Sequence, residues 1–188
     1  MRTVKVFLDP LTATALTIAV AVLLTFNIAG SVRANYFTQM QSMQSSLSDD
    51  DRTFMMEAAT GGMAEVELGR MAATKGQNAK VKRFGQRMVR DHSKANAELK
   101  QLAMRKGVTL PTELPQEQMS EKEKLSNFSG ADFDREYMMM MVADHDKDVT
   151  AFEEKSSNAA DPDLKKFVTK TLPTLKVHQR LAKANSVK

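Results

Sequence analysis

The chain has 188 residues, a formal net charge of +4 and no cysteine. The length fits one domain with additional segments. The lack of cysteine excludes disulfides, thiolate metal sites, iron–sulfur clusters and a cysteine nucleophile. None of the eight glycines lies in a GxGxxG or GxxxxGK[ST] pattern, so the sequence has no phosphate-binding loop of either kind. Aromatic residues make up only 6% of the chain and are scattered among helix formers, so we expect no nucleic-acid partner.

The first 34 residues have the pattern of an export segment. Arg2 and Lys5 precede an uncharged apolar run over residues 11–30, and Val32-Arg33-Ala34 has the small-x-small spacing of a signal-peptidase site. The run is also long enough to span a bilayer. Residues 1–34 are therefore predicted to be a signal peptide or an uncleaved hydrophobic anchor helix. Either alternative places the rest of the chain in the periplasm, soluble or tethered to the inner membrane.

The remainder of the chain is predicted to be a linker followed by one helical domain. Residues 35–50 are rich in Gln and Ser, which is typical of a flexible linker. Over residues 51–186, apolar residues recur at steps of three and four, and no strand-like alternation occurs. Pro111 and Pro115 mark a long connection between the second and third helices. We predict an all-α, antiparallel four-helix bundle with a long connection between helices 2 and 3.

Several residues predict where the helices begin and end. Ser48 opens a capping box for the first helix, and Gly107 is a stop for the second. Asp161 followed by a proline is a strong start for the fourth helix. The Gly61-Gly62 pair inside the first helix lowers helix propensity, which is tolerable where it lets a neighbouring helix pack closely.

The three histidines are the main functional feature of the sequence. His92, His145 and His178 each fall in the apolar stripe of a different predicted helix, and Glu65 holds the matching position in the remaining one. Imidazoles and a carboxylate inside an apolar core are costly unless they are paired, neutral or bound to a metal. We therefore predict Glu65, His92, His145 and His178 as inward-facing metal ligands. Glu67 lies about 200° further round its helix and is expected outside, near Arg70.

An internal repeat surrounds two of the histidines. Residues 88–94 (MVRDHSK) recur as residues 141–147 (MVADHDK), with five identities in seven positions. In each copy a methionine lies four residues before the histidine and an aspartate lies immediately before it. Thioether with imidazole suits reduced copper, whereas imidazole with carboxylate suits iron, zinc or manganese, so the metal stays open among these four. The aspartates are expected to orient a histidine on a neighbouring helix.

Two alternatives to a single metal centre remain open. Helical rise places the four residues within a vertical spread of roughly 12 Å, which allows either convergence or two separate half-sites. The second alternative is a non-catalytic structural or interaction module of the envelope, with the histidines as hydrogen-bonded core residues and no metal. In that case a basic face of the second helix would contact an envelope partner or an anionic surface. The residues of this basic face are Lys80, Arg83, Arg87, Arg90 and Lys94.

No catalytic residue can be identified from the sequence. The Glu-x-x-His motif of ferritin-type diiron sites is absent at all three histidines, and neither HExxH nor GxSxG occurs. Enzyme activity and oligomeric state are therefore left open.

The motifs in combination resemble the bacterial domain-of-unknown-function family DUF4142. They are the run over residues 64–69, the run over residues 88–96, Phe133-Asp134 with Tyr137, Asp144-His145, and Leu172-Pro173 with His178. The resemblance covers about residues 52–184 and implies an exported ferritin-like helical bundle, but no reaction. The matching positions are Glu65, Glu67, Asp91, His92, Asp134, Tyr137, Asp144, His145 and His178.

Overall fold

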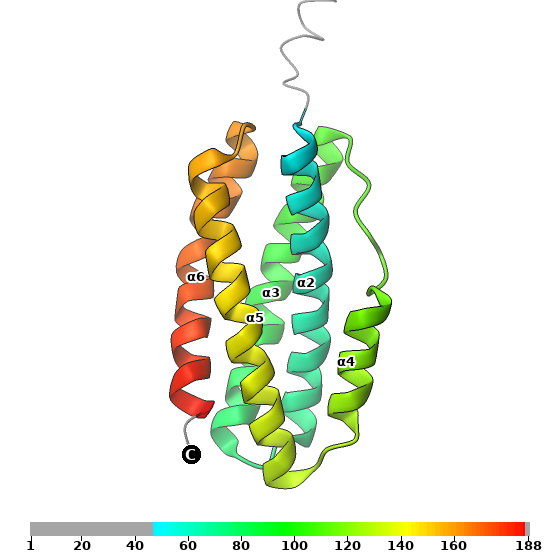
Figure 1. The fold of residues 1–188 in the computed structure, drawn as a ribbon, viewed down its shortest axis with the longest axis vertical. Helices are drawn as coiled ribbons and strands as arrows, with labels where there is room; N and C mark the ends of the chain where they lie inside the picture. The colour runs from blue at the N-terminus through cyan, green and yellow to red at the C-terminus, as the bar shows by residue number, and fades with distance from the viewer. Residues whose placement is uncertain (1–46, 187–188) are drawn as a thin grey trace, which may run out of the picture. The chain divides into compact units, whose positions relative to one another are not determined.

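The computed structural model describes residues 47–186, which contain five α-helices and no strand. The helices are α2 (Asp49–Lys75), α3 (Ala79–Lys106), α4 (Gln116–Ser126), α5 (Gly130–Asn158) and α6 (Pro162–Ser186). α2, α3, α5 and α6 form a bundle, and α4 flanks it (Figure 1). The predicted all-α class is confirmed for these residues. The predicted export segment and most of the predicted linker lie outside them.

The long connection between α3 and α5 sets the topology of the bundle. α2 with α3 and α5 with α6 form two antiparallel hairpins, and the connection that carries α4 returns the chain along the length of the bundle (Figure 1). α3 and α5 consequently run in the same direction, and the two hairpin turns lie at opposite ends. Among residues 47–186, no helix is both long enough and apolar enough to cross a membrane.

The helix ends follow the capping residues of the sequence. Ser48 accepts a hydrogen bond from the backbone N–H of Asp51 at 3.0 Å. Gly107 ends α3 with φ at 66°, in the left-handed region that favours glycine. At the start of α6, the Asp161 carboxylate accepts bonds from the backbone N–H groups of Asp163 and Leu164, each at 3.0 Å. Local sequence therefore fixes these three ends.

Buried Asp51 ties the start of α2 to the turn between α5 and α6. One oxygen, Oδ2, accepts bonds from the backbone N–H groups of Ala160 (3.0 Å) and Asp161 (2.9 Å). The other oxygen, Oδ1, lies 3.2 Å from Nζ of Lys155, and the two side chains are 1% and 6% exposed. One carboxylate thus joins the two hairpins at this end of the bundle.

Asp134 makes the equivalent connection at the opposite end. Its carboxylate, near the start of α5, accepts bonds from the backbone N–H groups of Gln77 (3.0 Å) and Asn78 (2.7 Å) in the turn between α2 and α3. This position matches the DUF4142 motif, and its contacts are structural.

The apolar core is divided into two clusters, one toward each end of the bundle. In each bundle helix the two clusters use different stretches of sequence, such as Met55 and Leu68 in α2, or Met88 and Leu99 in α3. Between these stretches each helix carries one buried polar residue. These residues are Glu65, His92, His145 and His178. The packing of the two clusters therefore holds four polar side chains in the middle of the bundle.

Candidate metal centre

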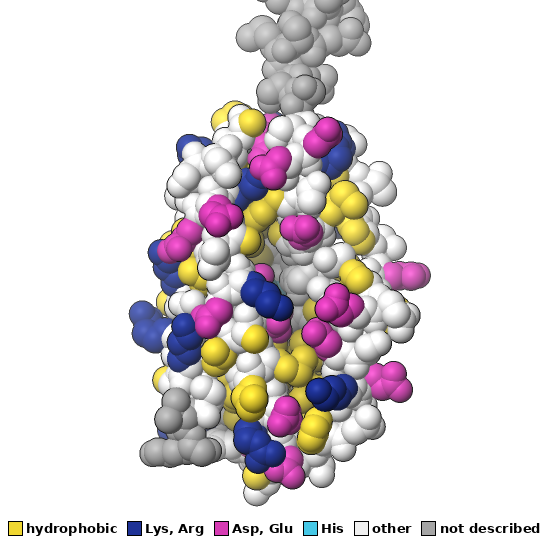
Figure 2. Space-filling model, viewed as in Figure 1, with side chains coloured by type: hydrophobic (Ala, Val, Ile, Leu, Met, Phe, Trp, Pro, Cys, Tyr) yellow, Lys and Arg dark blue, Asp and Glu magenta, His cyan; other side chains and the backbone are white. Residues whose placement is uncertain are grey.

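The four predicted ligands come together in one cluster. Glu65, His92, His145 and His178 are 3%, 5%, 0% and 0% exposed, and no histidine is visible on the face shown in Figure 2. The ring centroids of the histidines are 5.2 to 5.7 Å apart. One nitrogen from each ring lies within 4.8 Å of the nitrogens from the other two. The four side chains therefore form one cluster and not two separate groups.

Each ring has one nitrogen turned toward an oxygen. Nδ1 of His145 is 2.9 Å from the backbone carbonyl of Met141, and Nε2 of His178 is 3.0 Å from Oδ2 of Asp91. Both oxygens only accept, so these nitrogens carry the hydrogen. Nδ1 of His92 faces Oε2 of Glu65 at 2.7 Å. The remaining nitrogens, Nε2 of His92, Nε2 of His145 and Nδ1 of His178, are thereby left for a ligand.

Two of the distances between the inward atoms are close to the spacing of ligands on one metal ion. Nε2 of His92 and Nδ1 of His178 are 3.2 Å apart, and Nε2 of His145 is 3.2 Å from Oε1 of Glu65. Two ligands about 2.0–2.1 Å from a tetrahedral zinc ion lie about 3.3–3.4 Å from each other. Two nitrogen lone pairs facing each other at this distance repel unless a proton or a cation lies between them.

Three buried atoms of the cluster have no hydrogen-bond partner. Although Glu65 lies within ion-pair distance of His92 and His145, the groups are not aligned as hydrogen bonds. Both Glu65 oxygens and Nε2 of His145 are therefore unpartnered. Leaving such a group buried and unsatisfied costs about 1–3 kcal/mol, more for a charge. A bound cation would satisfy all three atoms, so the residues fit a metal ion.

Burial keeps the imidazoles neutral at physiological pH. It lowers the pKa of His92 and of His178 to about 4, and that of His145 below its usual value. Burial raises the pKa of Glu65 to about 7, against the opposing charge of His145. Neutral imidazoles are the form that binds a metal, whereas the Glu65 proton would be released on binding.

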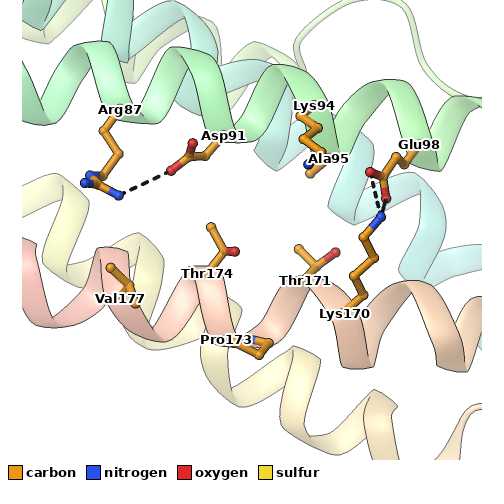
Figure 3. Close-up of a pocket in the computed structure, with 10 residues that line it drawn as sticks. All are labelled: Arg87, Asp91, Lys94, Ala95, Glu98, Lys170, Thr171, Pro173, Thr174 and Val177. Carbon is orange, nitrogen blue, oxygen red and sulfur yellow. Dashed lines mark hydrogen bonds and ion pairs between the residues drawn. The ribbon is translucent and has the colours of Figure 1, made fainter.

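Asp91 supports the centre from the surface of the bundle. It lies on α3 beside a groove of about 360 Å³ between α3 and α6, together with Arg87 and Thr174 (Figure 3). Partial burial raises the pKa of Asp91, but the hydrogen bond with His178 and the charge of Arg90 outweigh this effect and lower it. An ionised Asp91 holds His178 with Nδ1 turned inward. The prediction that an aspartate orients a histidine on another helix is confirmed for Asp91.

The second aspartate of the repeat behaves differently. Asp144 makes no such contact with a histidine among the interactions of the described residues; burial and the charge of Glu121 raise its pKa to about 6. Glu67 lies outside the cluster as expected, and it forms an ion pair with Lys122 of α4. Sequence periodicity cannot reveal that partner, because α4 reaches α2 only through the fold.

The sequence analysis missed Asp148. This residue lies on α5 three positions after His145, is partly exposed, and lines a small cavity with Glu65 and His92. Burial and the charge of Glu65 raise its pKa well above the usual value. The i, i+3 spacing from His145 was a detectable indication that the two side chains share one side of α5.

Comparison with protein families matches residues 37–184 to the domain of unknown function DUF4142. The chain belongs to this family. The resemblance inferred from the sequence motifs is thus confirmed, while the ferritin-like part of that expectation stays a prediction. No curated protein matches this DUF4142 chain.

Solved structures with a similar fold include a DUF305 fragment from Deinococcus radiodurans, with a TM-score of 0.65 and 12% identity over 73% of this chain and 95% of the other. CopM in the Cu(II)-bound form has a TM-score of 0.62 and 17% identity over 72% and 95% of the two chains. CopM in the Cu(I)-bound form has a TM-score of 0.60 and 17% identity over 71% and 93%. At these identities the likeness shows the fold alone.

Proposed function

We propose that this protein binds one transition-metal ion in the cell envelope, through His92, His145 and His178, with Glu65 as the fourth ligand. The observation that carries the proposal is the meeting of one nitrogen from each of the only three histidines within 4.8 Å, inside the bundle. The oxygen acceptors behind the rings and the unpartnered Glu65 carboxylate support it. Three imidazoles and a carboxylate suit zinc, iron, manganese or oxidised copper.

A copper-binding function is the second candidate, and specific residues favour it. Met88 and Met141 are fully buried on the same helix faces as His92 and His145, four residues before them. Thioethers select reduced copper. Proteins of similar fold include CopM in copper-bound and silver-bound forms, which supports testing soft metal ions.

The location in the envelope rests on the sequence. The apolar run over residues 11–30, with basic residues before it and a small-x-small site after it, has the pattern of an exported protein. We propose a periplasmic domain, either released or tethered to the inner membrane. Sequencing the mature N-terminus after fractionation tests this: a chain that begins at residue 35 indicates cleavage, and an intact chain in the membrane fraction indicates an anchor.

Metal binding is tested on protein purified without an affinity tag. We expect about one ion per chain by elemental analysis, and loss of that ion in the His92→Ala/His145→Ala double variant. An Asp146→Asn variant is the matched control, because Asp146 follows His145 directly but is partly exposed and pairs with Lys183. Absence of metal in the parent protein, after incubation with each candidate ion, contradicts the proposal.

Substitution of Met141 separates the two candidates. Met141→Leu preserves volume and removes the sulfur. If copper is held by Met/His pairs, this variant loses affinity for Cu(I) and retains affinity for Zn(II). If the imidazoles and Glu65 alone bind the metal, both affinities are retained.

The alternative of a structural or interaction module without a metal makes a different prediction. In that case no metal binds, the histidine substitutions only destabilise the bundle, and the basic face of α3 contacts an anionic partner. Equal destabilisation without any metal in the parent protein would favour this alternative.

A further inference from the structure

A small cavity lies directly beside the histidine cluster. Its volume is about 30 Å³, and Glu65, His92 and Asp148 line it together with Gly61 and Gly62. A cavity needs roughly 10–15 Å³ to hold one water molecule, so this one has room for an ion-sized guest. The two glycines contribute no side chain that would fill it.

The Glu65 carboxylate lies at the buried end of the cavity. Glu65 is 3% exposed and neither of its oxygens has a hydrogen-bond partner. Asp148 lies at the same cavity but is partly exposed to solvent. The two carboxylates are close enough for the charge of Glu65 to raise the pKa of Asp148. A cation held by Asp148 would therefore already be near the Glu65 carboxylate and His92.

The charges around the cluster differ from side to side. The groove between α3 and α6 is lined by Arg87, Lys94 and Lys170 and by two carboxylates, Asp91 and Glu98, which pair with Arg87 and Lys170 (Figure 3). Its charged lining therefore has an excess of one positive charge. On the opposite side, the surface between α5 and α2 is hollowed, with several acidic side chains in and beside the hollow and a basic side chain at its edge (Figure 2). Clefts of one charge sign concentrate ions of the opposite sign and accelerate their association.

We propose that Asp148 is the transfer ligand of the metal centre: it captures a hydrated cation at the surface between α5 and α2 and passes it through the cavity to Glu65 and the three histidines. This inference rests on the proposed metal-binding function. Asp148 lowers the barrier in both directions, since a transfer ligand contacts the ion during uptake and release but not in the final complex. Its removal should slow both rates by a similar factor and leave the equilibrium affinity nearly unchanged.

The test is stopped-flow uptake of aqueous Zn²⁺ by the metal-free full chain. We expect Asp148→Asn to slow association about tenfold, within the range by which charged clefts accelerate binding. Asp146→Asn is the matched control: it removes the same charge from the same helix, at a residue paired with Lys183. We expect the control to change the association rate less than twofold. We also expect added salt to slow association with the parent protein more than association with Asp148→Asn.

A second variant tests the route without a change in charge. Gly61 lines the cavity, and a Cβ placed there meets no atom within 4 Å. Gly61→Leu should narrow the cavity and slow metal uptake while leaving the four ligands unchanged. If Asp148→Asn fails to fold, the uptake rate of Gly61→Leu tests whether the ion passes through the cavity.

The outcomes separate this inference from the proposed function. Equal uptake rates for Asp148→Asn and Asp146→Asn overturn the inference alone. A faster release with unchanged association makes Asp148 a permanent ligand, which also overturns it. If the parent protein binds none of the candidate metals, the proposed function fails and the inference fails with it.

Discussion

Oδ2 of Asp91 lies 3.0 Å from Nε2 of His178, although the two residues belong to different helices and are 87 positions apart. His178 is fully buried, whereas the Asp91 side chain is 19% exposed. The contact therefore links the surface of α3 to the centre of the bundle. It fixes the ring of His178 with Nδ1 toward His92, which makes Asp91 a positioning residue for the proposed metal centre.

Substitution of Asp91 is expected to weaken metal binding without removing a ligand. Asp91→Asn replaces the charged carboxylate by a neutral amide, whose oxygen is a weaker acceptor for Nε2–H of His178 and holds the inward orientation of Nδ1 less firmly, so we predict a loss of metal affinity of about 10- to 100-fold. Competition titration with a chromophoric chelator measures it. Arg90→Gln is the control, since it removes an exposed ion pair with Asp91 and leaves the bond with His178. Equal affinity in both variants would contradict the role of Asp91.

Asp51→Ala is expected to destabilise the bundle by about 3 kcal/mol, because it leaves two backbone N–H groups without their acceptor and removes one of the two carboxylates that pair with buried Lys155, the other being Asp50. Urea unfolding followed by circular dichroism measures the free energy. Asp49→Ala removes an exposed carboxylate from the same first turn and should cost less than about 1 kcal/mol. Similar losses in the two variants would show that Asp51 does not act through the junction.

Substitution by alanine is expected to have opposite effects on stability at two glycines, Gly85 of α3 and Gly61 of α2. A Cβ on Gly85 would lie 2.6 Å from the backbone oxygen of Gly69, so Gly85→Ala must separate the helices and should cost about 1–3 kcal/mol. A Cβ on Gly61 meets no atom within 4 Å, so Gly61→Ala should stabilise the protein by up to about 1 kcal/mol through helix propensity. Thermal unfolding of both variants checks the sign.

The buried histidines are expected to lower the stability of the metal-free protein in acid. His92 and His178 have folded pKa values of about 4 against an unfolded value of 6.5, so the unfolded state binds more protons as pH falls from 6.5 to 4. This costs roughly 3 kcal/mol per histidine. Glu65 acts in the opposite sense: its folded pKa is about 7 against 4.5, so it favours the folded state as pH falls from 7 to 4.5.

Asp144, with a folded pKa of about 6, and Asp148, with a raised pKa, act in the same sense as Glu65, so these three carboxyl groups oppose the loss of stability that the histidines cause. Glu65→Gln removes one of these opposing contributions and should make the change of stability between pH 6.5 and 4.5 less favourable to the folded state. Urea unfolding across this pH range measures both curves. Parallel curves for the parent protein and Glu65→Gln would contradict the assignment of the raised pKa to Glu65.

Local sequence patterns are sufficient to predict the helices and the residues that face the core. Apolar periodicity, the caps at Ser48 and Asp161, and the stop at Gly107 depend on neighbours within a few residues, so they can be recognised from the sequence. Residues 138–141 are four consecutive methionines, and their burial also follows helical geometry: Met138 and Met141 are buried, whereas Met139 is 54% exposed. The inward placement of Glu65 and the three histidines follows from the same periodicity.

The meeting of these four side chains, in contrast, depends on how the helices pack. Their depths depend on how far each hairpin is displaced along the bundle, and a difference of four residues in helix position moves a side chain by about 6 Å. The partnership of Asp91 with His178, the junction at Asp51 and the position of Asp148 beside Glu65 likewise join distant parts of the chain. Such contacts are selected by the packing of whole helices, which no local pattern of residues records.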